Sequence, residues 1–117
     1  MKEQKYTEIV LETLTKMYDV SEPKLDFMNY IQTTNKYVDN KNHKRVETEK
    51  HLSIEEMVEK NFSIDVPFEE HFIDEDKFEE IIHEQIKKYK LNKLEQKRFK
   101  NQIYLGCSPT YKKYKKE

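Results

Sequence analysis

Apolar residues recur at helical spacing near the start of the chain. Over residues 4–18 they follow one another three or four positions apart, while charged residues fill much of the opposite side. Such a stripe is typical of an amphipathic helix with one face in the core. Its members are Tyr6, Ile9, Val10, Leu14, Met17 and Tyr18. Ser21 and Pro23 then predict the capped start of a second helix. Its buried positions are expected to be Leu25, Phe27, Met28, Tyr30 and Ile31.

The clearest helical pattern covers residues 74–90. Asp74 is the expected cap, and acidic residues crowd the first turns while lysines crowd the last, as the helix dipole favours. The expected buried stripe is Phe78, Ile81, Ile82, Gln85, Ile86 and Tyr89. Asn92 predicts the start of a further helix, whose apolar positions are Leu94, Phe99, Ile103 and Tyr104.

The middle of the chain is less regular. Ser53 and Glu56 have capping-box spacing, which predicts a short helix at 54–60. Residues 62–68 alternate apolar and polar positions like a strand, and Pro67 excludes a central strand. Residues 35–50 are polar and predict an exposed loop. An edge strand around residues 45–52 is the alternative.

The C-terminal stretch YLGCSPTYKKYKKE contains the chain's one glycine and one cysteine. Gly106 predicts a left-handed helix stop, and Ser108 with Pro109 predicts the start of a final short helix. Helix, turn and basic helix give a helix-turn-helix outline. Gln102 and Lys112 stand where that motif usually has a small and an apolar residue. The whole pattern predicts one mainly α-helical domain over residues 1–117, with about five helices and at most a minor β element around 62–68.

Composition changes this picture in four ways. Only 35% of residues are hydrophobic and 38% are charged. The expected core is therefore thin, which leaves room for a homodimer or another partner to complete it. The chain has no run of about 18 apolar residues and no signal-peptide core, so neither membrane insertion nor export is expected. A single cysteine fits a reducing cytoplasm. Alanine is absent and residues with A/T-rich codons dominate, which indicates an A/T-rich genome such as that of a phage, plasmid or virus.

Charge is divided unevenly along the chain. Residues 1–86 have 11 basic and 21 acidic residues, whereas residues 87–117 have 11 basic and two acidic ones. Such asymmetry indicates an interaction region. Lysines among aromatic residues suit contacts with nucleic-acid phosphates and bases. The function expected first is therefore that of a non-enzymatic accessory or regulatory protein that binds nucleic acid. The candidate residues are Lys97, Arg98, Lys100, Tyr111, Lys112, Lys113, Lys115 and Lys116.

An acidic block between residues 65 and 84 supports a different function, that of a protein-binding modulator or inhibitor of a larger machine. The candidate contacts are Glu69, Glu70, Phe72, Asp74, Glu75, Asp76, Glu79 and Glu80. A solvated helix face would have the same composition.

Catalytic and metal-binding patterns are not found in the sequence. The four histidines lack the i, i+4 spacing of a zinc helix, and Cys107 has no second cysteine to pair with. Phosphate loops, nucleophile elbows and HExxH are also missing. We therefore expect no enzyme activity, metal or cofactor. Cys107 would be reactive if it lay at the start of a helix amid lysines, whereas a lone cysteine after a turn is more often a small packing residue.

Overall fold

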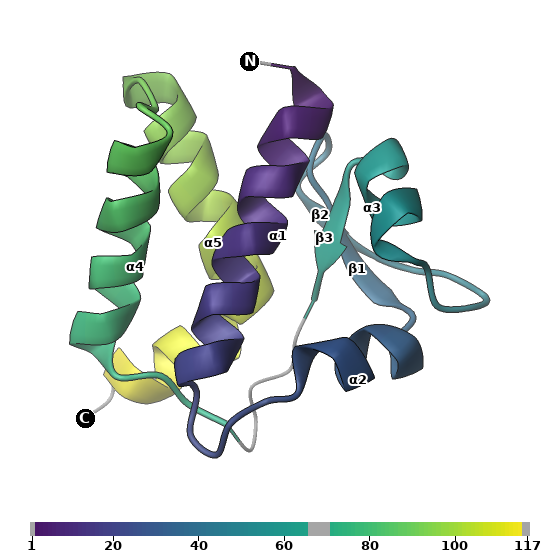
Figure 1. Cartoon of the computed structure of the whole chain (residues 1–117), viewed down its shortest axis with the longest axis horizontal. Coiled ribbons are helices and arrows are strands. Elements are labelled where there is room, and N and C mark those ends of the chain that lie inside the picture. Colours follow the sequence, from purple (N-terminus) through teal and green to yellow (C-terminus); the bar gives the residue numbers. More distant parts are fainter. Residues whose placement is uncertain (1, 66–70, 116–117) are drawn as a thin grey trace.

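The computed structural model describes the backbone of residues 2–65 and 71–115, and the side chains of residues 2–65 and 71–107. In these ranges the chain forms helices and a small sheet (Figure 1). The helices are α1 (Glu3–Val20), α2 (Phe27–Thr33), α3 (Ile54–Lys60), α4 (Glu75–Lys88) and α5 (Lys93–Lys115). The strands are β1 (Lys36–Asp39), β2 (Lys44–Glu47) and β3 (Phe62–Ile64). The prediction of a mainly α-helical protein is confirmed.

The core is built around α1. Nine of its residues are buried, including the whole predicted stripe, and the helix packs against α4, α5, α3, α2 and β3. Figure 1 shows α1 with α4 on one side and the sheet on the other. From α4 the core receives Phe78, Ile81 and Ile82, with Gln85 also buried. Four of the six predicted stripe residues of α4 are thus buried, whereas Ile86 and Tyr89 are only half-buried at the end of the helix. The helix that contacts the most other elements is α1.

Three predicted helix starts are confirmed by their hydrogen bonds. The Asp74 carboxylate accepts from the backbone N–H groups of Asp76 and Lys77. Ser53 and Glu56 form the reciprocal bonds of a capping box. Asn92 and Glu95 exchange the same pair of bonds at the start of α5. In each case a side chain satisfies N–H groups that the first helical turn leaves without partners.

The second helix begins later than predicted. Ser21 ends α1 instead of starting α2, and its hydroxyl donates to the Tyr18 carbonyl. Asp26 is the N-cap of α2, because its side chain accepts from the Asn29 N–H. The later start turns Met28 outward, with 58% of its surface exposed. Leu94, also expected in the core, is 82% exposed on the first turn of α5.

The prediction of an exposed loop at residues 35–50 is wrong. β1 pairs antiparallel with β2 and with β3, giving the strand order β2-β1-β3. Tyr37 and Val38 of β1 are fully buried. The turn after β1 is held by the Asp39 carboxylate, which accepts from the N–H groups of Lys41 and Asn42. The alternative prediction, an edge strand around residues 45–52, overlaps β2, which ends at Glu47. The sheet contains more strands than the single minor element predicted at residues 62–68. Within that element Phe62–Ile64 is a strand, and residues 66–68 lie outside the described residues.

The prediction that Gly106 ends a helix in a left-handed turn is also wrong. No glycine has a positive φ, and the backbone stays helical through Gly106. The irregular residue is Cys107, with φ −122° and ψ 16°, where two helical segments meet at a kink. A Cβ on Gly106 would lie 3.2 Å from the Ile64 carbonyl oxygen. Gly106 thus allows α5 to approach β3 closely, and the tight turn of a helix-turn-helix is absent at this position.

A buried polar network joins α1, the sheet and α5. The Asn40 side chain donates to the Thr7 hydroxyl at 2.8 Å and accepts from the Ser63 hydroxyl at 3.2 Å. Ser63 accepts in turn from the Gln102 amide at 3.2 Å. All four side chains are nearly inaccessible to solvent. Because buried polar groups are costly without partners, these bonds fix the position of the hairpin on the helices.

Candidate nucleic-acid interface

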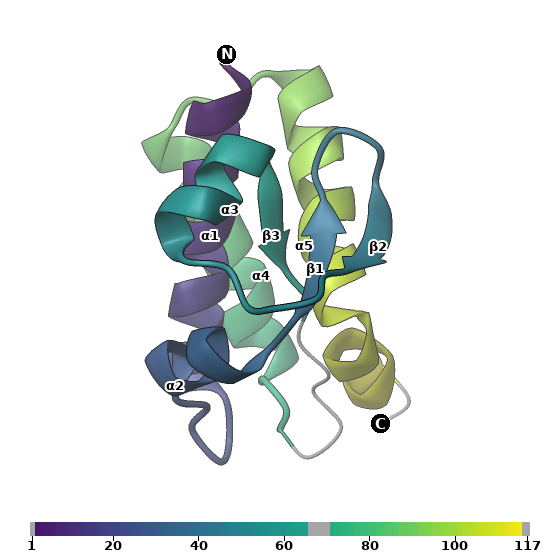
Figure 2. The same ribbon diagram turned by 90° about the vertical axis from the view of Figure 1, so that its right-hand side faces the viewer.

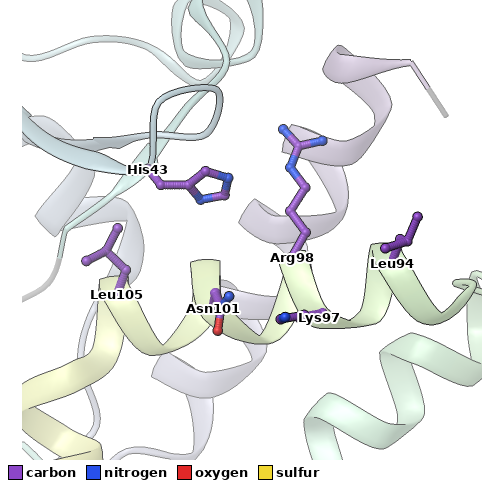
Figure 3. A pocket seen from close by; sticks show the side chains of 6 residues that line it. All are labelled: His43, Leu94, Lys97, Arg98, Asn101 and Leu105. Carbon is purple, nitrogen blue, oxygen red and sulfur yellow. The ribbon is translucent and has the colours of Figure 1, made fainter.

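A hollow of about 430 Å³ lies between the hairpin turn and α5 (Figure 3). Its lining residues are His43, Leu94, Lys97, Arg98, Asn101 and Leu105. Five of them come from successive turns of α5, and His43 reaches over from the turn between β1 and β2. None of the six is acidic. The hollow therefore combines basic and amide groups on an apolar base.

The chain's two arginines hold the walls of this hollow together. The Arg98 guanidinium, from α5, donates to the carbonyl oxygen of Asn40 at 3.0 Å. In the opposite direction, the Arg45 guanidinium of β2 donates to the carbonyl oxygen of Leu105 at 2.9 Å. Each arginine is also paired with a carboxylate, Arg98 with Glu3 and Arg45 with Asp65. One hydrogen bond near each end of the hollow thus ties the hairpin to α5.

Arg98 is further constrained by Tyr6 of α1. The guanidinium carbon lies 4.1 Å from the Tyr6 ring centroid, a cation–π geometry. The hydrogen bond to the Glu3 carboxylate raises the pKa of Arg98 above its already high usual value. The nearby Glu3 charge is therefore neutralised inside the molecule. Figure 3 shows the Arg98 side chain extending away from α5 toward α1.

Lysines provide the cations that remain available around the hollow. Lys93 and Lys97 are exposed one turn apart on α5, about 6 Å along its axis. Lys44 is exposed at the start of β2, next to His43. None of these three forms an ion pair with another described residue. Glu95, the acidic residue in the first turn of α5, is engaged in capping through Asn92. Lys93 and Lys97 thus present exposed ammonium groups beside the hollow, whereas the charge of Lys44 also acts on the nearby Asp39 carboxylate. Burial raises the pKa of Asp39, but side-chain and backbone hydrogen bonds together with this charge outweigh burial and lower that pKa.

The residues predicted from sequence divide into three groups. Lys97 lines the hollow, and its ammonium is exposed. Arg98 lines it too, but its guanidinium is occupied by Glu3, Asn40 and Tyr6, and Lys100 is half-buried. The third group is Tyr111, Lys112, Lys113, Lys115 and Lys116. The first four belong to the terminal part of α5, whose side chains are outside the described residues, and Lys116 is itself outside the described residues.

The acidic candidates gather at the start of α4, away from the hollow. Phe72 is 44% exposed and pairs through its backbone with Glu22. Asp74 is occupied in capping, whereas Asp76 and Glu80 are exposed and Glu75 and Glu79 are half-buried. Glu69 and Glu70 lie outside the described residues. The described carboxylates, from Asp74 to Glu80, lie in the first two turns of α4, where the helix dipole alone favours them.

Cys107 is not available for chemistry in this fold. Its thiol is fully buried, and burial raises the pKa of the thiol well above the usual value. A thiol that is neither accessible nor ionised is a poor nucleophile. Among the described residues, no group of three His, Cys, Asp or Glu side chains is placed to hold a metal ion. Nor is any helix of these residues long and apolar enough to cross a membrane.

Sequence reasoning missed His43 and Asn101, because their place depends on the hairpin folding onto α5. The only local signal was the run Asp39-Asn40-Lys41-Asn42, which has the residue types of a tight turn. Asn101 continues the Lys93–Lys97 row at four-residue spacing. No protein-family model, curated protein or solved structure matches this chain.

Proposed function

We propose that this protein is a non-enzymatic accessory or regulatory protein that binds nucleic acid through backbone phosphates. The observation that carries the proposal is the hollow between the hairpin turn and α5, which has Lys97, His43 and Asn101 at its wall and, among the described residues, no acidic lining residue. Lys93 and Lys44 extend the same surface. Phosphate contacts of this kind give affinity without base recognition. The cytoplasm is the compartment we propose.

The terminal lysines of the sequence extend this surface in the proposal. They follow the kink at Cys107 in the sequence, where the helical segment that carries Lys93 and Lys97 meets a second helical segment. Aromatic residues among them, Tyr111 and Tyr114, are suited to stacking on unpaired bases. The combination favours a protein that contacts many phosphates weakly over one that reads a sequence.

Salt-dependent binding tests the proposal. In the Lys44→Gln/Lys93→Gln/Lys97→Gln variant, we expect weaker binding to duplex DNA and to single-stranded RNA, measured by fluorescence anisotropy at several salt concentrations. Each lost phosphate contact on duplex DNA removes about 0.9 from the slope of log affinity against log salt, so three contacts remove up to about 2.7. All three lysines are exposed, and the fold should survive.

The matched control is Lys16→Gln/Lys60→Gln/Lys77→Gln, which changes net charge equally through exposed lysines that do not line the hollow. The control should retain most of the affinity and the slope. Equal losses in both triple variants would show that net charge alone binds the probe. No loss in the first variant would contradict the interface and favour the protein-binding modulator.

A truncated chain that ends at Cys107 provides a second test of nucleic-acid binding. The cut is placed there because Cys107 itself is buried in the core. Removing Lys112, Lys113, Lys115 and Lys116 should flatten the slope by up to about 3.6 on duplex DNA. Circular dichroism melts of the truncated chain would separate lost binding from lost folding.

A further inference from the structure

Three adjoining hollows form a second surface on the other side of the molecule. Their volumes are about 650, 500 and 220 Å³. Met28 lines the first and second, Ile54 the first and third, and Phe27 and Thr15 the second and third. Shared lining residues make them one continuous groove over α1, α2 and α3, which we call the α2–α3 groove. Figure 2 shows α2 and α3 on the side of the molecule opposite β2.

The α2–α3 groove has an apolar base and apolar edges. Leu11, Phe27, Ile31 and Leu52 line it and are almost completely buried beneath it. Met28 and Ile54 stand at its edges with 58% and 41% of their surfaces exposed. Single exposed apolar residues are ordinary on protein surfaces. Met28 and Ile54, however, flank one groove with an apolar base, and such a pair resembles the anchor positions of a docking site.

The groove has more acidic than basic lining residues. Two lysines line it, Lys24 and Lys50, against six carboxylates: Glu8, Glu12, Asp19, Asp26, Glu55 and Glu56. Two of these carboxylates are paired, since Lys24 lies 3.6 Å from Asp19 and Glu12 forms an ion pair with Lys88 of α4. Glu8 and Glu55 are exposed and form no ion pair with another described residue. Backbone and side-chain hydrogen bonds from Ser53 lower the pKa of Glu56, which keeps it anionic.

We propose that the α2–α3 groove docks a basic amphipathic helix of a partner protein. The apolar face of such a helix would cover Met28 and Ile54, and lysines or arginines at its flanks would meet Glu8 and Glu55. This is the helix-in-groove mode of recognition, with apolar anchors every three or four residues. The carboxylates repel nucleic acid and anionic lipid surfaces, so charge complementarity selects a cationic partner. The groove is separate from the phosphate-binding surface, and its test does not depend on the proposed function.

Binding of a model helix tests this proposal. The probe is a fluorescent synthetic peptide of leucine and lysine whose leucines form one helical face. Comparison peptides have the same composition in scrambled order, or glutamate in place of lysine. We expect the leucine–lysine helix to bind the full chain at least tenfold more tightly than either comparison peptide. If the scrambled peptide bound equally well, an amphipathic helix would not be what the groove recognises. If the glutamate peptide bound equally well, the positive charge of the partner would not matter.

Variants of the chain then locate the site. Met28→Ser/Ile54→Ser and Glu8→Gln/Glu55→Gln should each weaken binding of the leucine–lysine helix at least fivefold. Met28→Leu/Ile54→Leu keeps the apolar edges and should retain it. Glu84→Gln, an exposed position on α4 outside the groove, is the charge control and should also retain it. Melting curves verify that each variant is folded. Unchanged binding in both the serine and glutamine variants would overturn the groove as the docking site.

Discussion

At the scale of single residues, the role of a basic side chain cannot be inferred from its neighbours in the sequence. Arg98 stands between Lys97 and Lys100 and has the sequence context of a phosphate contact. In the fold its guanidinium binds Glu3 and the Asn40 carbonyl and stacks on Tyr6. Lys97, one position earlier, points outward. Position around the helix, and not local charge density, decides which cation is available to a ligand.

Gly106 gives a residue-scale prediction that separates the expected role from the observed one. A left-handed glycine is replaced more easily by asparagine than by alanine, because asparagine tolerates that conformation. A helical glycine in close contact prefers alanine, which is smaller and the better helix former. We therefore expect Gly106→Ala to be more stable than Gly106→Asn, and Gly106→Val to lose about 2 kcal/mol or more through overpacking against Ile64 and Leu14. Urea denaturation of the three variants measures the order. If Gly106→Asn were the most stable, the helical backbone at this position would be wrong.

At the scale of elements, the hairpin depends on buried hydrogen bonds more than on its own apolar residues. β2 has no fully buried residue, and only Tyr37 and Val38 of β1 are buried. Asn40 compensates through its backbone as well as its side chain, since its N–H donates to the Asn61 carbonyl and its carbonyl accepts from Arg98. These hydrogen bonds therefore attach the hairpin turn to α1, to the C-terminal end of α3, to β3 and to α5.

The Asn40→Ala substitution tests this attachment. It leaves the buried Thr7 and Ser63 hydroxyls without their amide partner, which should cost roughly 1–3 kcal/mol of unfolding free energy. Amide protection of β1 and β2 should fall further than that of α4, as measured by hydrogen exchange. Lys41→Ala, in the same turn but exposed, is the control and should change neither quantity appreciably. Equal loss of protection in the hairpin and α4 would mean that the network supports the whole fold and not the hairpin.

The sequence predicted the helices better than the sheet, for a physical reason. In α1 the apolar spacing lies within a single helix, and in α3 and α4 the apolar positions and the capping residue lie within a few residues of one another, so the signal is local. β1 and β2 are four residues each, too short for alternation to stand out from polar neighbours. Their stability comes from Asn61, Ser63 and Arg98, which lie distant in the chain. The candidate site was predictable only as a basic region, because its geometry depends on that hairpin.

At the scale of the whole molecule, α1 and α4 are joined by an ionic cluster around Glu12. The Glu12 carboxylate accepts hydrogen bonds from Tyr89 at 2.6 Å, Gln85 at 2.8 Å and Lys88 at 3.1 Å. Partial burial opposes ionisation, but these bonds outweigh it and lower the pKa of Glu12 from 4.5 to about 2. The folded molecule therefore holds this carboxylate in its charged form more strongly than the unfolded chain does.

This difference predicts a pH-dependent contribution to stability. Since the folded-state pKa is the lower one, the contribution is complete above about pH 4.5 and disappears as the pH falls toward 2. At neutral pH we expect Glu12→Gln to lose roughly 1 kcal/mol, a value reduced for solvent screening, because Glu12 is only half-buried. Thermal melts of both proteins between pH 2 and 7 should converge at the acidic end. Glu80→Gln, exposed on α4, should run parallel to the unaltered protein; a constant gap for Glu12→Gln would contradict the assignment.

The Glu3–Arg98 pair, which joins the first turn of α1 to α5, has a consequence for how the protein is made. The two partners are 95 residues apart in the chain. A ribosome that adds roughly 5–20 residues per second needs on the order of 5–20 s to pass from one to the other. For most of that interval the apolar stripe of α1 has been synthesised while α4 is still incomplete, and α5 begins only near its end. Nascent α1 therefore exposes its apolar stripe to chaperones until the α4 and α5 segments that cover it have been made.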